Sequence, residues 1–301
     1  MSESVKIAAV TGARGVIGEL IVQMLLEAGW DVRVLTRSDH LSNSSQLTVV
    51  TSDINDENGL RNLLEGVNAV FHCAAELTNE KKMYSTNVEG TRKLIKLIAN
   101  TKASYFCHLS SAGVIGPTSI PYVTEATNCN PRNLYERTKY EAEMLVSNSN
   151  IGMNICILRP TNVVSYAMPG ILSSFVHNSW RHKIKFYIKG RENAHIVYAK
   201  DVASAAMFFM NNSKSETNTY LVSRDDDEQN TYAGIYNMYQ YINCKNNNLK
   251  FSLPIVIPNM LRKIFKGDSL HGRVCFSNDK LKNTGFVFKY NVEECLRDIC
   301  R

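Results

Sequence analysis

The sequence predicts an α/β protein with a doubly wound parallel sheet and a smaller C-terminal lobe. Strand-like apolar stretches alternate with helical patterns from residue 5 to residue 158, and such alternation favours a parallel sheet with helices on both faces. Residues 69–74 (Ala-Val-Phe-His-Cys-Ala) form an almost continuous apolar run, which is typical of a strand that is buried on both faces. A glycine-rich turn at 11–18 joins the first strand to the first helix.

The pattern gives the elements in chain order. The expected strands are 5–10, 31–36, 47–51, 68–73, 104–109 and 152–158, and the expected helices are 16–28, 56–65, 81–100 and 133–148. Beyond Pro160 the alternation weakens. There we expect a helix at 201–210, a strand at 218–222, and helices at 232–242, near 258–266 and from about residue 291. Residues 224–230 are polar and acidic and predict a loop.

Composition indicates an ordinary globular protein; its positive net charge suits an anionic ligand, but a positive excess spread along the chain is more often plain surface composition. Of the 301 residues 44% are hydrophobic and 21% are charged, and the net charge is +6. No basic run supports nucleic acid as a partner. No stretch of about 18 apolar residues predicts a membrane span, and the N-terminus enters a strand without a signal peptide. The apolar-then-basic segment 251–266 is interpreted as a strand end and packed helix rather than as an interfacial anchor.

The eight cysteines predict free thiols. None forms a Cys-x-x-Cys pair, and Cys73, Cys107 and Cys156 fall inside predicted buried strands, where a thiol behaves as a small apolar group. We therefore expect neither disulfides nor a metal site, and we expect a reducing, cytoplasmic location.

The glycine turn has the sequence Thr-Gly-Ala-Arg-Gly-Val-Ile-Gly at 11–18, between a strand and a helix. This is the context in which a glycine fingerprint binds a dinucleotide pyrophosphate. Gly12 permits the tight turn, Gly15 lets backbone N–H groups approach the phosphates, and Gly18 lets the helix pack closely on its strand. The N-terminus of the helix adds a positive field.

Further motifs follow this turn in order. They are Asp53-Ile54, Phe71-His-Cys-Ala-Ala75, Asn87-Val-Glu-Gly-Thr91, Leu109-Ser-Ser-Ala-Gly-Val-Ile-Gly116, Tyr135-Glu-Arg-Thr-Lys139 and Leu158-Arg-Pro-Thr-Asn-Val163. With the glycine turn they resemble the extended short-chain dehydrogenase/reductases, often called the NAD-dependent epimerase/dehydratase family. The resemblance covers roughly the first two-thirds of the chain. One departure is Ile115, where the family usually has Tyr.

The resemblance implies a Rossmann-type cofactor domain formed by residues 1–164 plus 201–222. A smaller, interleaved substrate-binding lobe would comprise 165–200 plus 223–301. Many relatives form homodimers through a four-helix bundle, so the helices expected at 81–100 and 133–148 are the candidate dimer faces.

The same resemblance implies a cofactor site at the glycine turn and at the strand ends. Its residues would be Gly12, Arg14, Gly15, Val16, Ile17, Gly18, Arg37, Asp53, Ile54, Cys73, Ala74, Ala75, Tyr135, Lys139, Pro160, Asn162 and Val163. Arg37 follows the second strand, where NAD-preferring enzymes place an acid; its guanidinium can instead pair with the 2′-phosphate of NADP(H). Arg14 could reach the same phosphate. NADP(H) is therefore favoured, and the nearby Asp39 keeps NAD(H) open.

The candidate catalytic residues are Ser111, Tyr135, Lys139 and Asn87. Ketone reduction needs a hydride donor and a proton donor, and a Lys139 ammonium one helical turn after Tyr135 would favour the phenolate. Ser111 would donate a hydrogen bond to the substrate oxygen. By resemblance, Lys139 also binds the nicotinamide ribose and Asn87 holds a water near Lys139.

Five polar residues have simpler interpretations. Asn87 could instead cap a helix beginning at residue 88. Glu125 is interpreted as a structural turn residue rather than as an acid catalyst. We interpret Thr86, His72 and His108 as packing or strand-end residues.

The substrate is less well defined. Most family members of this length act on nucleoside-diphosphate sugars, and many hold the diphosphate with an Arg seven residues before an Asp that looks like Asp201. That position is Ala194 here, although Arg191, displaced by three residues, could substitute; Arg181, Lys185 and Lys189 are other basic candidates. The Ala112-Gly113 pair after Ser111 replaces the Asp-Glu pair of dehydratases and disfavours that activity.

The main hypothesis is an NADPH-dependent ketoreductase of a keto-sugar nucleotide, a small anionic substrate. A nucleotide-sugar C4 epimerase with retained NAD is the first alternative. A reductase of a hydrophobic ketone, similar to dihydroflavonol reductases or hydroxysteroid dehydrogenases, is the second. A non-catalytic NADPH-sensing regulator would be a different class, but such relatives typically lose the Tyr or the Lys, and both are present here.

Overall fold

The structure is a computed structural model that describes residues 6–38, 43–172, 180–211, 216–244, 252, 254 and 274–300. Asp39 and the helix expected near 258–266 lie outside the described residues. The segment 251–266 is described only at Ser252 and Pro254.

The chain divides into two compact units, which we treat separately. Unit 1 comprises Met1–Val114, Pro131–Arg159 and Val202–Tyr220, and unit 2 comprises Ile115–Asn130, Pro160–Asp201 and Leu221–Arg301. The sequence analysis assigns 115–130 and 160–164 to the cofactor domain, whereas these segments group with unit 2. The reason is local pairing, because strands within both segments pair with other segments of unit 2.

Unit 1 is built on a seven-stranded sheet with the order β10-β7-β5-β4-β1-β2-β3. The strands are β1 (Ile7–Thr11), β2 (Asp31–Thr36), β3 (Leu47–Thr51), β4 (Ala69–His72), β5 (Tyr105–Leu109), β7 (Asn154–Pro160) and β10 (Thr217–Val222). The pairs from β3 to β7 are all parallel. The chain runs outward from β1 to β3 and then returns to β4, so the strand order reverses between β1 and β4. Ligands of doubly wound sheets bind beside the carboxyl ends of the strands at such a reversal.

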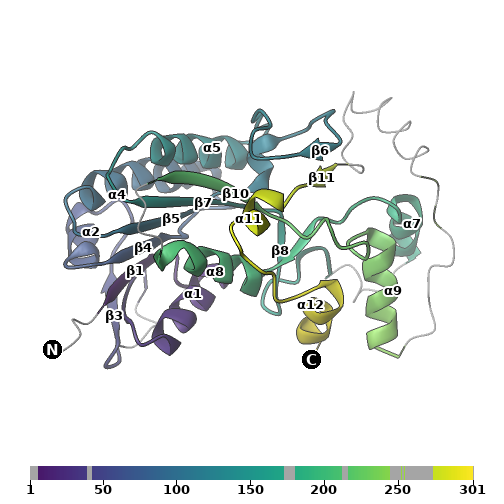
Figure 1. The fold of residues 1–301 in the computed structure, drawn as a ribbon, viewed down its shortest axis with the longest axis horizontal. Helices are drawn as coiled ribbons and strands as arrows, with labels where there is room; N and C mark the ends of the chain where they lie inside the picture. Colours follow the sequence, from purple (N-terminus) through teal and green to yellow (C-terminus); the bar gives the residue numbers. More distant parts are fainter. Residues whose placement is uncertain are drawn as a thin grey trace. The chain divides into compact units, whose positions relative to one another are not determined.

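Helices cover both faces of this sheet. They are α1 (Val16–Glu27), α2 (Glu57–Leu64), α3 (Glu80–Tyr84), α4 (Gly90–Ile98), α5 (Leu134–Ser147) and α8 (Ala199–Phe208). Figure 1 shows α2, α4 and α5 on one face, with α1 and α8 on the other. The predicted doubly wound α/β fold is therefore confirmed. The helix expected at 81–100 is observed as α3, a π-helical turn at Ser85–Glu89, and α4.

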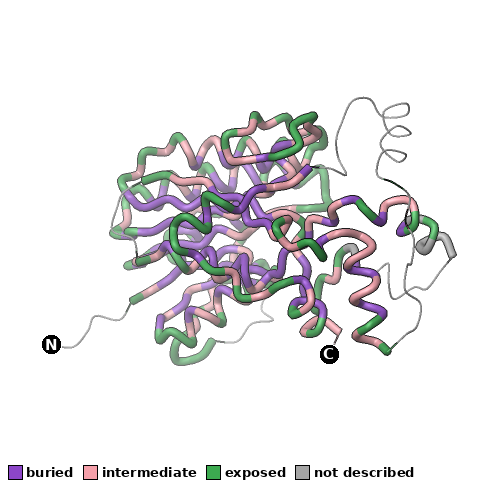
Figure 2. The backbone as a smooth tube through the Cα atoms, turned by 45° about the vertical axis from the view of Figure 1, so that its right-hand side comes forward, coloured by how far each residue is buried: buried purple, intermediate pink, exposed green. Residues whose placement is uncertain are grey.

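The core of unit 1 lies between the sheet and the helices α2, α4 and α5. Its fully buried side chains include Leu60, Leu63, Leu94, Ile98 and Phe106. Figure 2 shows that burial continues along the strands of the sheet. Each such side chain contributes about 1.5–3 kcal/mol through its removal from water, so the strand ends that carry the candidate site rest on a rigid base.

Unit 2 contains two small parallel sheets and a helical core. Strand β6 (Tyr122–Val123) pairs with β11 (Cys275–Phe276), and β8 (Asn162–Val164) pairs with β9 (Ile196–Tyr198). The helices are α7 (Trp180–Lys189), α9 (Tyr232–Ile242), α11 (Asp279–Asn283) and α12 (Val292–Ile299). Phe186, Ile235 and Leu296 are fully buried in the core of this unit.

The acidic stretch at 224–230 connects three parts of unit 2. The Asp225 carboxylate accepts from His195 Nδ1 at 2.6 Å and from the Phe276 amide at 2.9 Å. Asp226 accepts from Asn278 and Lys282, and Asp227 accepts from the Val292 amide. The acidic side chains of this predicted loop therefore bind His195 just before β9, the β11–α11 segment and the start of α12.

Candidate active site

The glycine turn packs directly against the end of β4. Gly12 has a φ of +71°, and a Cβ atom at this position would lie 2.5 Å from the Ala74 nitrogen. A Cβ atom on Gly18 would lie 2.2 Å from the Gly12 carbonyl oxygen. Only glycine fits at both positions, which agrees with the turn and the close packing expected from the sequence.

The N-terminus of α1 is open to a ligand. Gly15 is the N-cap residue of this helix, and no side chain caps it, whereas α2 and α5 are capped by Asp56 and Asn133. Val16 and Ile17 form the first turn, where backbone N–H groups have no partner within the helix. A bare N-terminus beside a glycine turn suits an anionic group such as a pyrophosphate.

A directed chain of hydrogen bonds joins the glycine turn to the Asn87 helix. The Thr91 hydroxyl donates to the Asn87 carbonyl at 2.6 Å. Since its proton is committed there, Thr91 must accept from His72 Nε2 at 2.8 Å. His72 Nδ1 therefore accepts from the Thr11 hydroxyl at 2.7 Å, and Thr11 in turn accepts from the Ala74 amide. The network assigns His72 as the neutral Nε2–H tautomer.

Burial keeps His72 uncharged. Burial, together with the nearby charge of Lys139, lowers the pKa of His72 to about 3. Burial and the same charge also lower the pKa of His108, which is fully buried. Their burial is compatible with the packing role that the sequence analysis gives to both residues.

Asn87 holds the segment after β4 against α5. Its Oδ1 accepts from the Glu76 amide at 2.7 Å, and its Nδ2 donates to the Glu76 carbonyl and to Thr138 Oγ1. The chain is already helical from Glu80, and Asn87 lies in the π-helical turn. The alternative that Asn87 caps a helix beginning at residue 88 is therefore wrong. π-Turns of this kind occur frequently at functional sites.

Ser111 is hydrogen-bonded to Tyr135, and Lys139 lies one helical turn beyond Tyr135 on α5. A hydrogen bond from Ser111 lowers the pKa of Tyr135, but burial has the larger effect and raises it. Since the Gly113 amide donates to Ser111 Oγ at 3.1 Å, the Ser111 hydroxyl proton can point to the phenol. The sequence analysis expects the Lys139 ammonium to favour the phenolate, but desolvation of Tyr135 dominates its pKa in the structure.

Lys139 is 3% exposed and donates from Nζ to the Leu109 carbonyl at 2.5 Å. Burial lowers its pKa to about 8, while the acidic groups Cys73 and Glu143 oppose this shift. Lys139 therefore remains predominantly protonated at neutral pH, on the same helical face as Tyr135.

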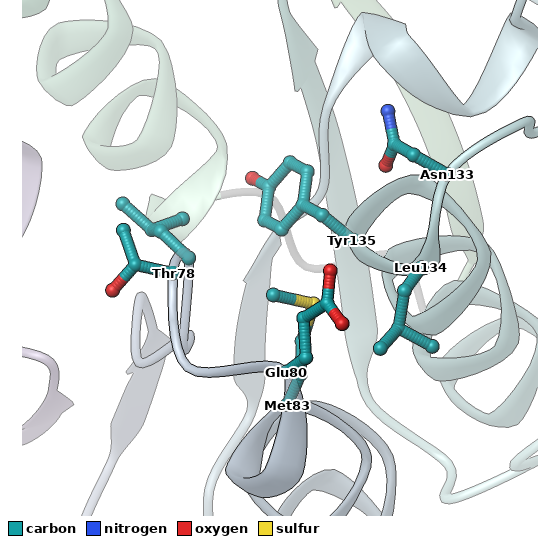
Figure 3. A pocket seen from close by; sticks show the side chains of 7 residues that line it. Thr78, Glu80, Met83, Asn133, Leu134 and Tyr135 are labelled. Atoms are coloured by element: carbon teal, nitrogen blue, oxygen red, sulfur yellow. The ribbon is translucent and has the colours of Figure 1, made fainter.

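A cavity of about 400 Å³ lies beside Tyr135. It is lined by Leu77, Thr78, Glu80, Met83, Asn133, Leu134 and Tyr135. Figure 3 shows Tyr135 and Leu134 of α5 beside Met83 and Glu80 of α3. The Asn133 side chain is committed to the cap of α5, so Leu77, Met83 and Leu134 give the wall its apolar character.

The loop that carries Leu77 and Thr78 is fixed by one carboxylate. Glu76 Oε1 accepts from the amides of Leu77, Thr78 and Asn79 at 3.0–3.1 Å. These backbone hydrogen bonds lower the pKa of Glu76. The Asn87 side chain also binds the Glu76 main chain. Glu76 and Asn87 together therefore fix the loop that forms one wall of the cavity.

Three charged residues are expected to determine the preference for NADP(H) or NAD(H). Arg37 and Asp53 follow β2 and β3, and Arg14 lies in the glycine turn. Arg14 donates to Ser38 Oγ at 2.6 Å, and Arg37 is exposed without a partner among the described residues. Asp53 is also exposed and accepts from the Asn55 amide at 2.9 Å. Ile54 is 5% exposed and belongs to the core of unit 1. Cys73, Ala74 and Ala75 follow β4 and are partly exposed.

Several expected site residues belong to unit 2. Pro160 is buried at the end of β7, and Asn162 and Val163 form β8. The Asn162 side chain donates to the Ala194 carbonyl at 2.8 Å. Ala194 is 1% exposed, and Arg191 lies at the surface.

The acidic residues Glu125 and Asp201 also have partners within unit 2. Glu125 accepts from the Leu221 amide at 2.7 Å, which supports the structural interpretation. Asp201 accepts from the Lys289 amide, and burial raises its pKa to about 6.

Unit 1 contains a buried charge network that is not among the residues expected from the sequence. Arg159 of β7 forms an ion pair with Glu143 of α5 at 2.5 Å, and Ser110 donates to Glu143 at 2.6 Å. A signal was present, because an arginine in a predicted buried strand requires a buried partner. Glu143 also stands one helical turn beyond Lys139.

All eight cysteines are free thiols. No cluster of His, Cys, Asp and Glu suited to a metal ion occurs in the described part of the chain. Among the described helices, none combines the length and apolar character needed to cross a bilayer.

Comparison with known proteins defines the family. The model of the NAD dependent epimerase/dehydratase family matches residues 8–223. The chain therefore belongs to this family, the extended short-chain dehydrogenase/reductases, and is an enzyme of it. The resemblance inferred from the sequence motifs is confirmed.

Two sequence relatives and one solved structure illustrate the similarity. An uncharacterized protein, y4nG, of Sinorhizobium fredii is 31% identical over 67% of this chain and 53% of its own length. The decarboxylating sterol-4-alpha-carboxylate 3-dehydrogenase of Dictyostelium discoideum is 32% identical over 64% of each chain. This chain thus spans less than two-thirds of the length of either relative. The structure of the Bordetella bronchiseptica enzyme WbmH, determined with NAD+, superposes with a TM-score of 0.78 at 19% identity. The match covers 98% of this chain and 97% of the WbmH chain.

Proposed function

We propose that the protein transfers a hydride between NADP(H) and a secondary alcohol or ketone. The observation that carries this proposal is Tyr135, which lines a cavity in unit 1, is hydrogen-bonded to Ser111 and lies one helical turn before the buried Lys139. The open N-terminus of α1 and the close approach of Gly12 to β4 fit a bound dinucleotide. When bound, the nicotinamide supplies or accepts the hydride.

Residues of the chain would transfer the proton that accompanies the hydride. In the reducing direction the carbonyl carbon gains the hydride and Tyr135 gives its phenolic proton to the carbonyl oxygen. Ser111 donates a hydrogen bond to that oxygen as charge develops. Lys139 stabilises the phenolate that forms, and solvent returns the proton. Asn87 acts here as a positioning residue, because it fixes Glu76 and Thr138 around this group.

NADP(H) is the favoured cofactor. Arg14 is held at the end of β2 by Ser38, and the Arg37 guanidinium is exposed. Two guanidinium groups at this strand end suit the 2′-phosphate, because bidentate charge-assisted hydrogen bonds are strong. A carboxylate here would instead suit the ribose diol of NAD. In this proposal unit 1 binds the cofactor and unit 2 contributes to substrate recognition.

The favoured substrate is a hydrophobic cyclic alcohol or ketone, as in the hydroxysteroid-type alternative. The cavity beside Tyr135 has the apolar side chains Leu77, Met83 and Leu134. The position expected to carry a diphosphate-binding arginine is the buried Ala194. The Dictyostelium relative, named as a sterol dehydrogenase, supports the same substrate class.

A keto-sugar nucleotide is the second candidate. The observation that favours it is Arg191, which is exposed and has no partner among the described residues. Its guanidinium is suited to a diphosphate. We favour net reduction over epimerisation of this substrate. An epimerase must retain NAD through its cycle, whereas the proposed NADP(H) would be exchanged after each turnover.

The two substrate classes can be separated with purified protein. NADPH oxidation is followed with a 3-ketosteroid and with a UDP-4-keto-6-deoxy sugar, and each reaction is repeated with Tyr135→Phe. Turnover of the steroid that is lost in the variant supports the first candidate. Turnover of the nucleotide sugar, abolished by Arg191→Ala, supports the second. Absence of NADPH binding would sink both candidates.

A further inference from the structure

We propose that the buried Glu143–Arg159 ion pair is a positioning device that sets the geometry of the Ser111–Tyr135–Lys139 group. This inference rests on the proposed function for the roles of Ser111, Tyr135 and Lys139. It concerns two residues outside that group.

The ion pair is fully inside unit 1. Glu143 is 1% exposed and Arg159 is 5% exposed. Arg159 Nη2 lies 2.5 Å from Glu143 Oε1, and Arg159 Nε donates to both carboxylate oxygens at 3.1–3.2 Å. One edge of the guanidinium, formed by Nε and Nη2, therefore holds the carboxylate in a bidentate contact that restricts both partners.

The carboxylate has one further partner, and that partner lies at the active segment. Ser110 donates from Oγ to Glu143 Oε2 at 2.6 Å. Its amide donates to the Leu158 carbonyl at 2.7 Å, beside Arg159. Ser110 is 3% exposed and therefore has no access to bulk water for these bonds. The end of β5 is in this way fixed to α5 and to β7 at once.

The two neighbours of Ser110 are both functional groups in the proposed reaction. Leu109 holds the Lys139 ammonium through its carbonyl, and Ser111 donates to Tyr135. A shift of Ser110 would move both groups, because they are its covalent neighbours. The carboxylate also lies on the same helical face as Tyr135 and Lys139, since the three residues are spaced by four.

If the ion pair only joined α5 to β7, its desolvation would cost more free energy than apolar packing of the same two elements. Removing two charges from water costs several kcal/mol per ion, and apolar side chains of similar volume often serve stability as well. Here the charge has a second effect, because Glu143 opposes the loss of the Lys139 proton. Other titratable groups near Lys139 in the described residues include Cys73 and His72 of the β4 end and His108 of β5, with Tyr135 on the same helix and the Arg159 cation paired with Glu143. Burial leaves both histidines neutral and raises the pKa of the Cys73 thiol, so Glu143 is the formal negative charge among these groups.

The test compares Glu143→Gln with Glu141→Gln, which changes an exposed carboxylate on the same helix. The pKa of Lys139 is followed by NMR of ¹³Cε-labelled lysine, with Lys139→Met to assign the signal. Glu143→Gln leaves the Arg159 cation uncompensated, so we expect the Lys139 pKa to fall by about one unit or more. Glu141→Gln should leave it unchanged. Equal pKa values in folded Glu143→Gln and Glu141→Gln would overturn the proposal.

Two further variants separate positioning from folding. Ser110→Ala keeps the ion pair but removes its link to β5, and it should lower kcat about 10-fold at unchanged NADPH affinity. If Glu143→Gln does not fold, the double variant Glu143→Met/Arg159→Met removes both charges together. We expect that variant to fold and bind NADPH while its kcat falls. Wild-type kcat in both Ser110→Ala and the folded double variant would refute the positioning role.

The NMR measurement of the Lys139 pKa does not depend on the identity of the substrate. If wild-type protein reduces neither class of ketone, the proposed function fails, but the Lys139 pKa still reports on Glu143. If wild-type protein is active and Lys139 is insensitive to Glu143, only the positioning inference fails.

Discussion

Replacing Lys139 by Met should stabilise the folded protein at neutral pH while abolishing hydride transfer. Lys139 is 3% exposed, and burial lowers its pKa from 10.5 to about 8. A pKa shift is a free-energy difference between folded and unfolded states, at about 1.4 kcal/mol per unit. The buried ammonium therefore costs about 3 kcal/mol at pH 7.

The expected gain is smaller than this cost. Lys139→Met also removes the donor to the Leu109 carbonyl, and loss of such a hydrogen bond costs about 1 kcal/mol. The net expectation is a free energy of unfolding about 2 kcal/mol higher than that of the wild type at pH 7. Destabilised functional groups of this kind are common in active sites.

The pH dependence provides the sharper test. Because the folded pKa lies below the unfolded one, the unfolded chain holds a proton on Lys139 between about pH 8 and pH 10.5 that the folded protein has lost. Wild-type stability relative to the variant must therefore rise with pH in this window, by about 1.4 kcal/mol per unit. Below pH 8 the difference should be constant.

The assay is urea unfolding of both proteins without cofactor from pH 7 to pH 9.5. Other groups titrate in this range, but their effects cancel in the difference between the two proteins. A variant that is less stable than the wild type at pH 7, by a margin that does not change with pH, would refute the reasoning about Lys139.

Two further predictions concern His72 and the cofactor pocket. In ¹⁵N NMR, His72 should show a protonated Nε2 and a bare Nδ1 without titration between pH 5 and pH 8, since burial lowers its pKa to about 3; a midpoint near 6.5 would contradict the assigned network. Arg37→Asp should weaken NADPH binding about 10- to 100-fold, because a hydrogen bond to a charged group contributes about 1.5–3 kcal/mol. NADH affinity, measured by the same fluorescence titration, should change little; equal losses for both cofactors would argue against a 2′-phosphate contact.

The fold of unit 1 could be predicted because its elements carry strong local signals. The run at 69–74 is apolar enough to specify a buried strand, and β4 is observed at Ala69–His72. Gly12 and Gly18 mark positions where a side chain would collide with backbone. Such signals depend on residues close in sequence, so a single sequence contains them.

The elements of unit 2 were harder to predict for the same reason. Strands β6, β8, β9 and β11 have two or three residues each, which is too short for a periodic pattern. Their pairing depends on contacts between distant segments, such as Cys275 with Tyr122. The π-helical turn around Asn87 also has no distinct composition, because it continues a helical pattern on both sides.

In the candidate site, too, the features set by nearby residues could be predicted, and those set by packing between distant segments could not. Tyr135 and Lys139 could be found by their spacing along one helix. The Glu143–Arg159 pair depends on the packing of α5 against β7, which spacing alone does not reveal. The pKa of Tyr135 was expected to fall, and burial raises it instead, because desolvation depends on the whole surrounding structure.

The most direct test of the proposed activity is transfer of deuterium from NADPH deuterated at C4 of the nicotinamide. Wild-type protein and Tyr135→Phe are incubated with the steroid and nucleotide-sugar ketones, and the products are analysed by mass spectrometry. We predict one deuterium on the new carbinol carbon with the wild type. In the variant the rate should fall by about 10²–10⁴-fold at nearly unchanged NADPH affinity. Transfer at the wild-type rate in Tyr135→Phe, or no transfer by the wild type to either ketone, would contradict the account.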